Sequence, residues 1–338
     1  MNRPRLIAVV AFVVTGLLGT SCGPLPGFVG VCGTRLCQSG APFVVKGATA
    51  YGQYGNAANE VALAKHAGVN VLELVEFDSH YHTLSDTESA ATWTRVDQFI
   101  AAAKGSGLHV ILNLSEYGQS LAASGQVPTT ADWGPYLSFI ANRVNTVTGA
   151  KYALDPTIAM VELYGEIDAP NYSVPTRGTT AQMTAFFSRT LAQWKAAAPN
   201  ILVSSGGFSY INDPNSGIDW KTIMADRNDA TCDVEVNSYP DRNVSVPEVA
   251  AYCKQLGKPW FLSAWSSCYR TPGWGANDIN DWPSDSAMSA HAQDMYNLTK
   301  ADNALGSDFW NLANKPVVNG MCDIGSQFPQ TLATVTGN

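Results

Sequence analysis

Short apolar runs alternate with amphipathic stretches along most of the chain. The runs are apolar on both faces, and they cover residues 43–50, 69–74, 108–114, 157–163, 201–204, 232–237, 260–263 and 308–312. Between them, apolar residues recur every three or four positions, as they do at Val96, Phe99, Ile100 and Ala103, and this spacing predicts helices. Buried strands that alternate with helices indicate a parallel sheet covered by helices on its outer face.

Eight strand–helix units fit a single α/β domain, the (β/α)8 or TIM barrel. A doubly wound open sheet is the alternative, but that fold is typically marked by a glycine-rich phosphate loop after its first strand. Residues 46–51 (KGATAY) do not form such a loop. We therefore expect one barrel over residues 43–338, and a short hairpin within residues 22–42 that covers its bottom.

The first 21 residues are expected to be a signal peptide. Arg3 and Arg5 precede an apolar run over residues 6–18, which is shorter than the roughly 20 residues that a membrane span needs. Residues 18–22 (LGTSC) resemble a permissive bacterial lipobox, in which Cys22 is lipidated and becomes the first residue. The alternative is ordinary cleavage nearby, which leaves Cys22 as a spare thiol. Both readings predict an exported protein, extracellular or in the cell envelope, and in the first a lipid anchor at Cys22 is the only membrane contact.

The other six cysteines are expected to form disulfides, since oxidising compartments favour pairing. In each expected pair the two cysteines flank one local unit or follow neighbouring strands of the barrel. The pairs are Cys32–Cys37, Cys232–Cys253 and Cys268–Cys322. A zinc site is the alternative, but no CxxC pair or Cys/His cluster has the spacing of metal ligands, and we expect no metal.

Composition narrows the classes of partner. Hydrophobic residues make up 46% of the chain, which is enough to bury a core and excludes intrinsic disorder. Only 14% of the residues are charged and the net charge is −8, which excludes a nucleic-acid partner because phosphate backbones require stripes of Lys and Arg. There is no Walker loop, dinucleotide fingerprint or calcium loop, so no cofactor is expected.

Carboxylates, aromatic rings and one amide follow the expected strands, at the end of the TIM barrel where this fold places its active sites. They include Glu73, Glu116, Glu166, Glu235, Asn237, Tyr239, Trp265 and Trp310. Aromatic rings stack on the C–H faces of sugars, and carboxyl groups handle glycosidic protons. This combination predicts an oligo- or polysaccharide partner. Glu235 precedes Asn237 by two positions, so it could instead be a buried, inward carboxylate with a partner or a raised pKa.

Residues 155–158 (DPTI) and 161–166 (VELYGE) resemble the fourth-strand segment of glycoside hydrolase family 5. That family is a retaining clan with paired glutamates on strands four and seven, and its mannanase-like members look nearest. Further similarities occur at 68–70 (GVN), 237–240 (NSYP) and 257–259 (GKP). The resemblance implies a TIM barrel and assigns Glu166 as the general acid/base.

The departures from the family pattern change the expected mechanism. Ala264 stands where the resemblance places the nucleophilic glutamate, and Glu73 stands where it places an arginine. Ser115 and Asn237 replace two histidines, and Gly165 replaces the asparagine before the acid/base. Because a methyl group cannot attack an anomeric carbon, the retaining mechanism is excluded.

Two functions follow from this pattern. One is a glycoside hydrolase in which Glu73 and Glu166 act across the cleft on a water molecule above Ala264, with the carboxyl separation of about 6.5–9.5 Å typical of inverting enzymes. In that reading the substrate-binding residues are Glu116, Asn237, Tyr239, Trp265 and Trp310. The other is a catalytically inactive carbohydrate-binding or scaffold protein that kept the barrel and lost the nucleophile.

Overall fold

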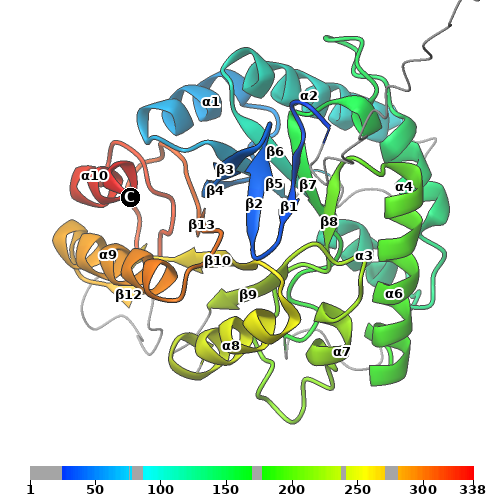
Figure 1. Cartoon of the computed structure of the whole chain (residues 1–338). Helices are drawn as coiled ribbons and strands as arrows, with labels where there is room; N and C mark the ends of the chain where they lie inside the picture. Colours follow the sequence, from blue (N-terminus) through cyan, green and yellow to red (C-terminus); the bar gives the residue numbers. More distant parts are fainter. Residues whose placement is uncertain (1–24, 76, 78–86, 170–176, 237–240, 271–280) are drawn as a thin grey trace, which may run out of the picture.

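Eight parallel strands form the centre of the molecule (Figure 1). The computed structural model describes residues 25–75, 77, 87–169, 177–236, 241–270 and 281–338. The strand order is β8-β7-β6-β5-β4-β13-β10-β9. The strands are β4 (Val45–Tyr51), β5 (Val71–Val75), β6 (His109–Asn113), β7 (Ile158–Glu162), β8 (Leu202–Ser204), β9 (Cys232–Val236), β10 (Trp260–Ser266) and β13 (Gly306–Trp310). A parallel bridge between Phe208 and Val234 connects the segment after β8 to β9, so the sheet curls into the predicted TIM barrel.

Helices surround the barrel as an outer layer (Figure 1). They are α1 (Ala57–His66), α2 (Thr87–Gly105), α3 (Ser115–Ala123), α4 (Gly134–Asn142), α6 (Thr180–Ala197), α7 (Trp220–Met224), α8 (Val246–Leu256), α9 (Asp285–Ala301) and α10 (Pro329–Gly337), with short turns η1 (Tyr152–Leu154) and η2 (Asp241–Ser245). Local sequence sets several of their ends. Thr179 and Gln182 form a capping box before α6, and Gly257 ends α8 at a φ of 69°.

The last strand begins earlier than its apolar run predicted. β13 starts at Gly306 rather than at residue 308, because Gly306 and the buried polar Ser307 are not residues that a search for apolar runs detects. In the same way β10 continues to Ser266, three residues beyond the expected end.

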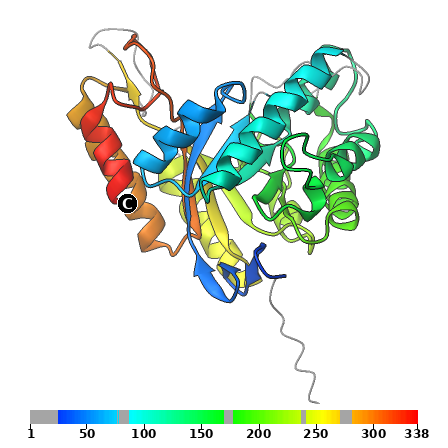
Figure 2. The ribbon, with the colours of Figure 1, turned by 90° about the horizontal axis from the view of Figure 1, so that it is seen from above.

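The N-terminal hairpin covers the bottom of the barrel, as predicted (Figure 2). It consists of the antiparallel strands β1 (Val29–Cys32), β2 (Arg35–Gln38) and β3 (Ala41–Phe43). Val29 and Leu36 belong to one apolar cluster with Val71, Ile111 and Phe261 from the barrel strands. These buried side chains pack between the hairpin and the barrel strands at this end of the barrel.

The three disulfides join the expected pairs, Cys32–Cys37, Cys232–Cys253 and Cys268–Cys322. The last of them follows β10 and lies next to the small strands β11 (Cys268–Tyr269) and β12 (Asp281–Trp282). Cys22 lies outside the described residues. In the part of the chain that the structure describes, no helix is both long enough and apolar enough to cross a bilayer.

Removing the Cys268–Cys322 bridge should lower the free energy of unfolding more than removing the Cys32–Cys37 bridge. The first spans 54 residues and the second 5, and the loss of chain entropy in the unfolded state grows with the length of the closed loop. We expect losses of about 4 and about 2 kcal/mol for the two Cys→Ala double variants. Urea denaturation measures both, and equal or reversed losses would contradict this account.

Candidate active site

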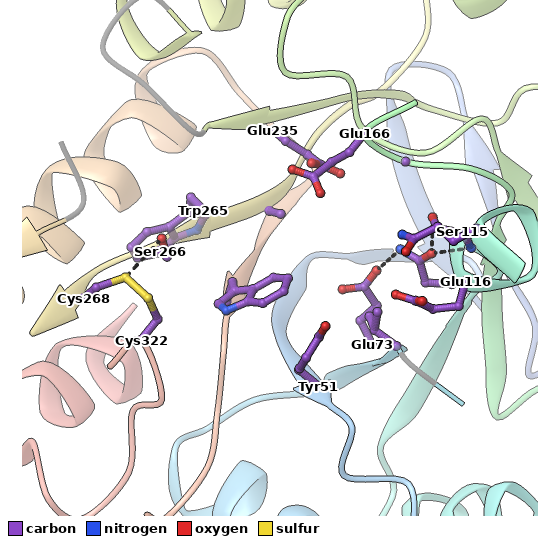
Figure 3. Close-up of a pocket in the computed structure, with 16 residues that line it drawn as sticks. Tyr51, Glu73, Ser115, Glu116, Glu166, Glu235, Trp265, Ser266, Cys268 and Cys322 are labelled. Carbon is purple, nitrogen blue, oxygen red and sulfur yellow. Dashed lines mark hydrogen bonds between the residues drawn. A yellow bond between two sulfur atoms is a disulfide. The ribbon is translucent and has the colours of Figure 1, made fainter. Parts of the chain in front are cut away.

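A pocket of about 440 Å³ opens at the carboxyl ends of the barrel strands (Figure 3). Four glutamates line it, and none of the described lining residues is a lysine, an arginine or a histidine. The glutamates are Glu73, Glu116, Glu166 and Glu235. Glu73 and Glu116 lie on one side of the pocket, and Glu166 and Glu235 lie on the other. The pocket therefore brings together both carboxylates of the predicted pair.

Glu73 is the third residue of β5, and the alternation of side chains along the strand turns it into the barrel. Its carboxyl group accepts hydrogen bonds from Thr49 Oγ1 at 2.9 Å and Asn113 Nδ2 at 2.7 Å. Burial raises the pKa of Glu73, although these hydrogen bonds and one with Glu162 act in the opposite direction. Burial, followed by the charge of Glu73, raises the pKa of Glu162 well above its usual range. In this pair, Glu162 is the carboxyl that keeps a proton more firmly.

Glu166 lies in the turn that follows β7, and its backbone is strained. Its φ is 55°, in the left-handed region that is unfavourable for residues with a Cβ. A hydrogen bond from Glu166 N to Gly207 O, at 2.8 Å, holds this turn against the segment after β8. Strained residues of this kind concentrate at functional sites, where the surrounding structure maintains them. The geometry therefore supports the site role that the sequence predicted for Glu166.

Glu235 is the pocket residue that sequence reasoning undervalued. It is 6% exposed, lies on β9, and its carboxyl group is beside that of Glu166 (Figure 3). Burial, then the charges of Glu166 and Glu162, raise the pKa of Glu235 well above its usual range. A Cβ at Gly165 would lie 3.0 Å from Glu235 Oε1, so Glu235 occupies the space that a side chain at position 165 would need. The alternation of side chains along β9 predicts that Glu235 points into the barrel, but it does not predict this contact with the backbone at Gly165.

Gly207→Ala should destabilise the protein. A Cβ at this position would overlap Ser263 Oγ and Glu235 Cγ, and both are buried side chains with little room to move. Overpacking of this kind costs about 1–3 kcal/mol of the free energy of unfolding. Chemical denaturation measures the loss. Gly105→Ala, whose Cβ would meet nothing within 4 Å, is the matched control and should not destabilise the protein. A Gly207→Ala variant as stable as this control would contradict the packing.

Glu116 and Trp310 lie in the pocket where the sequence placed them. Glu116 is in the first turn of α3, beside Ser115, whose Oγ donates to Asn113 Oδ1 at 2.6 Å. The rings of Trp310 and Tyr51 have centroids 4.7 Å apart, and both residues line the pocket. Each remains partly exposed, so this aromatic pair can offer a surface to a sugar ring.

Trp265 is among the residues that line the pocket, but little of its surface is open for the expected stacking role. This residue is 1% exposed, and its ring packs edge-on against Phe309 and Tyr296, at centroid distances of 4.9 and 5.1 Å. A register shift between Leu262 and Ala264 in β10 precedes it. Ala264 is the neighbour that is partly exposed in the pocket. Trp265 thus offers no free ring face to a ligand.

Two expected binding residues, Asn237 and Tyr239, lie outside the described residues, as does the 237–240 motif. Among the residues that the structure does describe, no group of three or more His, Cys, Asp and Glu side chains is arranged to hold a metal ion.

Comparison with known proteins shows that the fold of this chain is similar to that of several solved structures. No protein-family model matches the sequence, and no curated protein sequence matches it. The endo-1,4-β-mannanase of Rhizomucor miehei has a TM-score of 0.69 and 18% identity, over 92% of this chain and 98% of the mannanase. A glycoside hydrolase family 5 mannosidase from the same organism has a TM-score of 0.65 and 16% identity, over 92% of this chain and 96% of the mannosidase.

The catalytic domain of an endoglucanase from Thermobifida fusca has a TM-score of 0.56 and 16% identity, and the match covers 91% of this chain and 97% of that domain. At such identities the likeness concerns the fold. The resemblance found in the sequence is thereby confirmed at that level: the chain has the (β/α)8 barrel of the family 5 mannanases and cellulases.

Proposed function

We propose that the protein is an exported glycoside hydrolase that cleaves an oligo- or polysaccharide with Glu166 and Glu73 as its carboxyl pair. The observation that carries this proposal is their placement on opposite sides of one pocket, which Ala264 also lines (Figure 3). Structural neighbours that act on glycans add support, and so do the three disulfides, which suit an oxidising compartment outside the cytoplasm. A lipid anchor at Cys22 remains part of the proposal.

In the proposed reaction, Glu166 donates its proton to the glycosidic oxygen while Glu73 takes a proton from a water molecule. The water oxygen bonds to the anomeric carbon as the bond to the leaving oxygen breaks, which inverts the configuration at that carbon. Thr49 and Asn113 donate hydrogen bonds to Glu73, so both partners favour its ionised form. Burial opposes them and raises the pKa of Glu73, which makes the carboxylate a stronger base.

A second candidate is a carbohydrate-binding protein without turnover. It is favoured by the same contacts of Glu73, because a buried carboxylate held by two neighbouring side chains also fits a purely structural role. In this case the pocket and the Tyr51–Trp310 pair would bind a glycan that stays intact.

Product analysis distinguishes the two candidates. The purified protein is incubated with manno-, gluco- and arabino-oligosaccharides, and the anomeric configuration of new reducing ends is followed by proton NMR. Products that first appear with inverted configuration support the carboxyl pair. Products with retained configuration contradict it. Binding without cleavage supports the second candidate, and the absence of both binding and cleavage contradicts both.

A further inference from the structure

The pocket holds more carboxyl groups than the proposed reaction uses. Inverting hydrolysis needs two, whereas four glutamates line the pocket and none of its described lining residues is cationic. Glu235 is the extra carboxyl nearest the proposed acid, since it lies beside Glu166 (Figure 3). The excess of negative charge is therefore concentrated at the proton donor.

Glu235 is buried at the pocket wall, and its carboxyl group has almost no hydrogen-bond partner in the part of the chain that the structure describes. The one hydrogen bond of its carboxyl group, among the described residues, comes from Ser209 Oγ to Oε2 at the long distance of 3.5 Å. Its Oε1 lines the space left by Gly165, where any side chain would collide with it. An ionised carboxyl group in such a position destabilises the folded protein unless a cation pairs with it, and without a cation the group keeps its proton.

The charged groups that act most strongly on Glu235 are acids. Glu166, Glu162, Asp168 and Glu73 each raise its pKa, after burial, which is the largest cause. No described lysine or arginine is among them. Around Glu235, the described residues that affect it most are therefore acidic, and a cationic group of a ligand complements them.

Resting on the function proposed above, we propose that the substrate is a glycan of hexosamine units with free amino groups, and that Glu235 binds the ammonium group next to the cleaved bond. An ammonium group brings one positive charge and three donors, and Glu235 and Glu166 offer acceptors side by side. A hydroxyl or an acetamido group brings no charge. Uronic acid and phosphorylated sugars would add negative charge to a pocket that already has an excess.

Binding of such a ligand should release a proton. In the free protein, Glu235 holds a proton to a higher pH than an ordinary glutamate does. When the ammonium group docks, the carboxyl O–H bond breaks, the proton leaves to solvent, and the ammonium group stays intact against the carboxylate. Affinity should therefore fall as the pH is lowered, and a neutral oligosaccharide should show no such dependence.

Isothermal titration of the intact protein tests this inference with three probes: the hexamer of β-1,4-glucosamine, the hexamer of β-1,4-N-acetylglucosamine, and mannohexaose. At about pH 6 we expect the glucosamine hexamer to bind about 30-fold tighter than the other two, which is the range of a close charge pair. Titration in two buffers of different ionisation enthalpy should show proton release for this ligand alone. Raising the salt to about 0.5 M should weaken its binding several-fold.

Variants at position 235 identify the group responsible. Glu235→Gln should reduce the preference for the glucosamine hexamer over mannohexaose to about threefold or less. Glu235→Asp should keep part of the preference because it keeps the charge. Glu248→Gln, a change at a side chain 37% exposed on α8, should behave as the original protein.

Two outcomes overturn the inference: equal affinity for the three hexamers, or a preference that survives Glu235→Gln. If mannohexaose is bound or cleaved without any preference for the amino sugar, the glycosidase proposal stands and this inference falls. If no hexamer binds, this inference falls, and the glycosidase proposal is decided by the product analysis on gluco- and arabino-oligosaccharides.

Discussion

The free energy of unfolding should decrease by roughly 5 kcal/mol as the pH rises from about 5 to about 8, because several buried carboxyl groups keep their protons in the folded protein. Glu162 and Asp308 show the effect most clearly. Burial, then the charge of Glu73, raises the pKa of each well above its usual range. Burial likewise raises the pKa of Asp168 to about 7.

The direction follows from proton binding. In the unfolded chain these carboxyl groups ionise near pH 4, whereas in the folded protein they stay protonated to a higher pH. Between the two pKa values the folded state binds more protons, so its stability falls as the pH rises through that interval. Each pKa unit of difference contributes about 1.4 kcal/mol.

Two other groups limit stability at the acid end. Burial lowers the pKa of His291 to about 4, so the unfolded histidine takes up a proton below about pH 6.5 that the folded one refuses. Protonation of Asp97 likewise lowers the free energy of unfolding at acidic pH. Burial alone would raise its pKa, but hydrogen bonds from Arg143, Tyr152 and Thr146 lower it overall, and their stabilisation is lost as Asp97 is protonated. We expect maximal stability between about pH 5 and 6.

Urea denaturation at pH values from 5 to 8 measures this dependence. Asp308→Asn removes one of the groups with a raised pKa and should flatten the curve, whereas Glu248→Gln, at an exposed ion pair with Lys221, should leave its slope unchanged. Stability that stays constant or increases toward pH 8 would show that the interior carboxyl groups ionise without penalty.

The sequence predicted the barrel because its strands are apolar on both faces, and it failed where strand residues are polar and buried. Gly306 and Ser307 lie before the apolar run that predicted β13, although both belong to the strand and Ser307 is buried. A periodicity argument assumes that buried residues are apolar. The acidic interior of this barrel departs from that assumption.

The sequence predicted those site residues whose place depends only on their position at the end of a strand. Glu73, Glu116, Glu166 and Trp310 lie in the pocket because the carboxyl ends of barrel strands meet on one face. The stacking role predicted for Trp265 neglected the alternation of side chains along β10: Ala264 faces the pocket, so the ring of the next residue packs against Tyr296 of α9. The contact of Glu235 with the space beside Gly165 is a long-range packing relation, which one strand's pattern does not reveal.

Glu166→Gln and Glu73→Gln should each lower kcat/KM by about 1,000-fold on the glycan that the protein cleaves, a loss of about 4 kcal/mol of transition-state stabilisation. The amide keeps the shape of the side chain but neither donates the catalytic proton nor accepts one from water. Initial rates of product formation measure the loss, with Glu248→Gln as the control. Unchanged turnover in either Gln variant removes that residue from the pair.

Glu166→Gly separates a catalytic role from a structural one. The left-handed φ of 55° strains glutamate but not glycine, and relief of that strain outweighs the greater entropy that glycine gives the unfolded chain. We expect Glu166→Gly to be about 0.5–1 kcal/mol more stable than the original protein and to be inactive. Urea denaturation and rates on the same samples test both parts. A destabilised variant would mean that the carboxyl group of Glu166 contributes to the fold, whereas a stabilised and inactive one means that its strained position is maintained for chemistry.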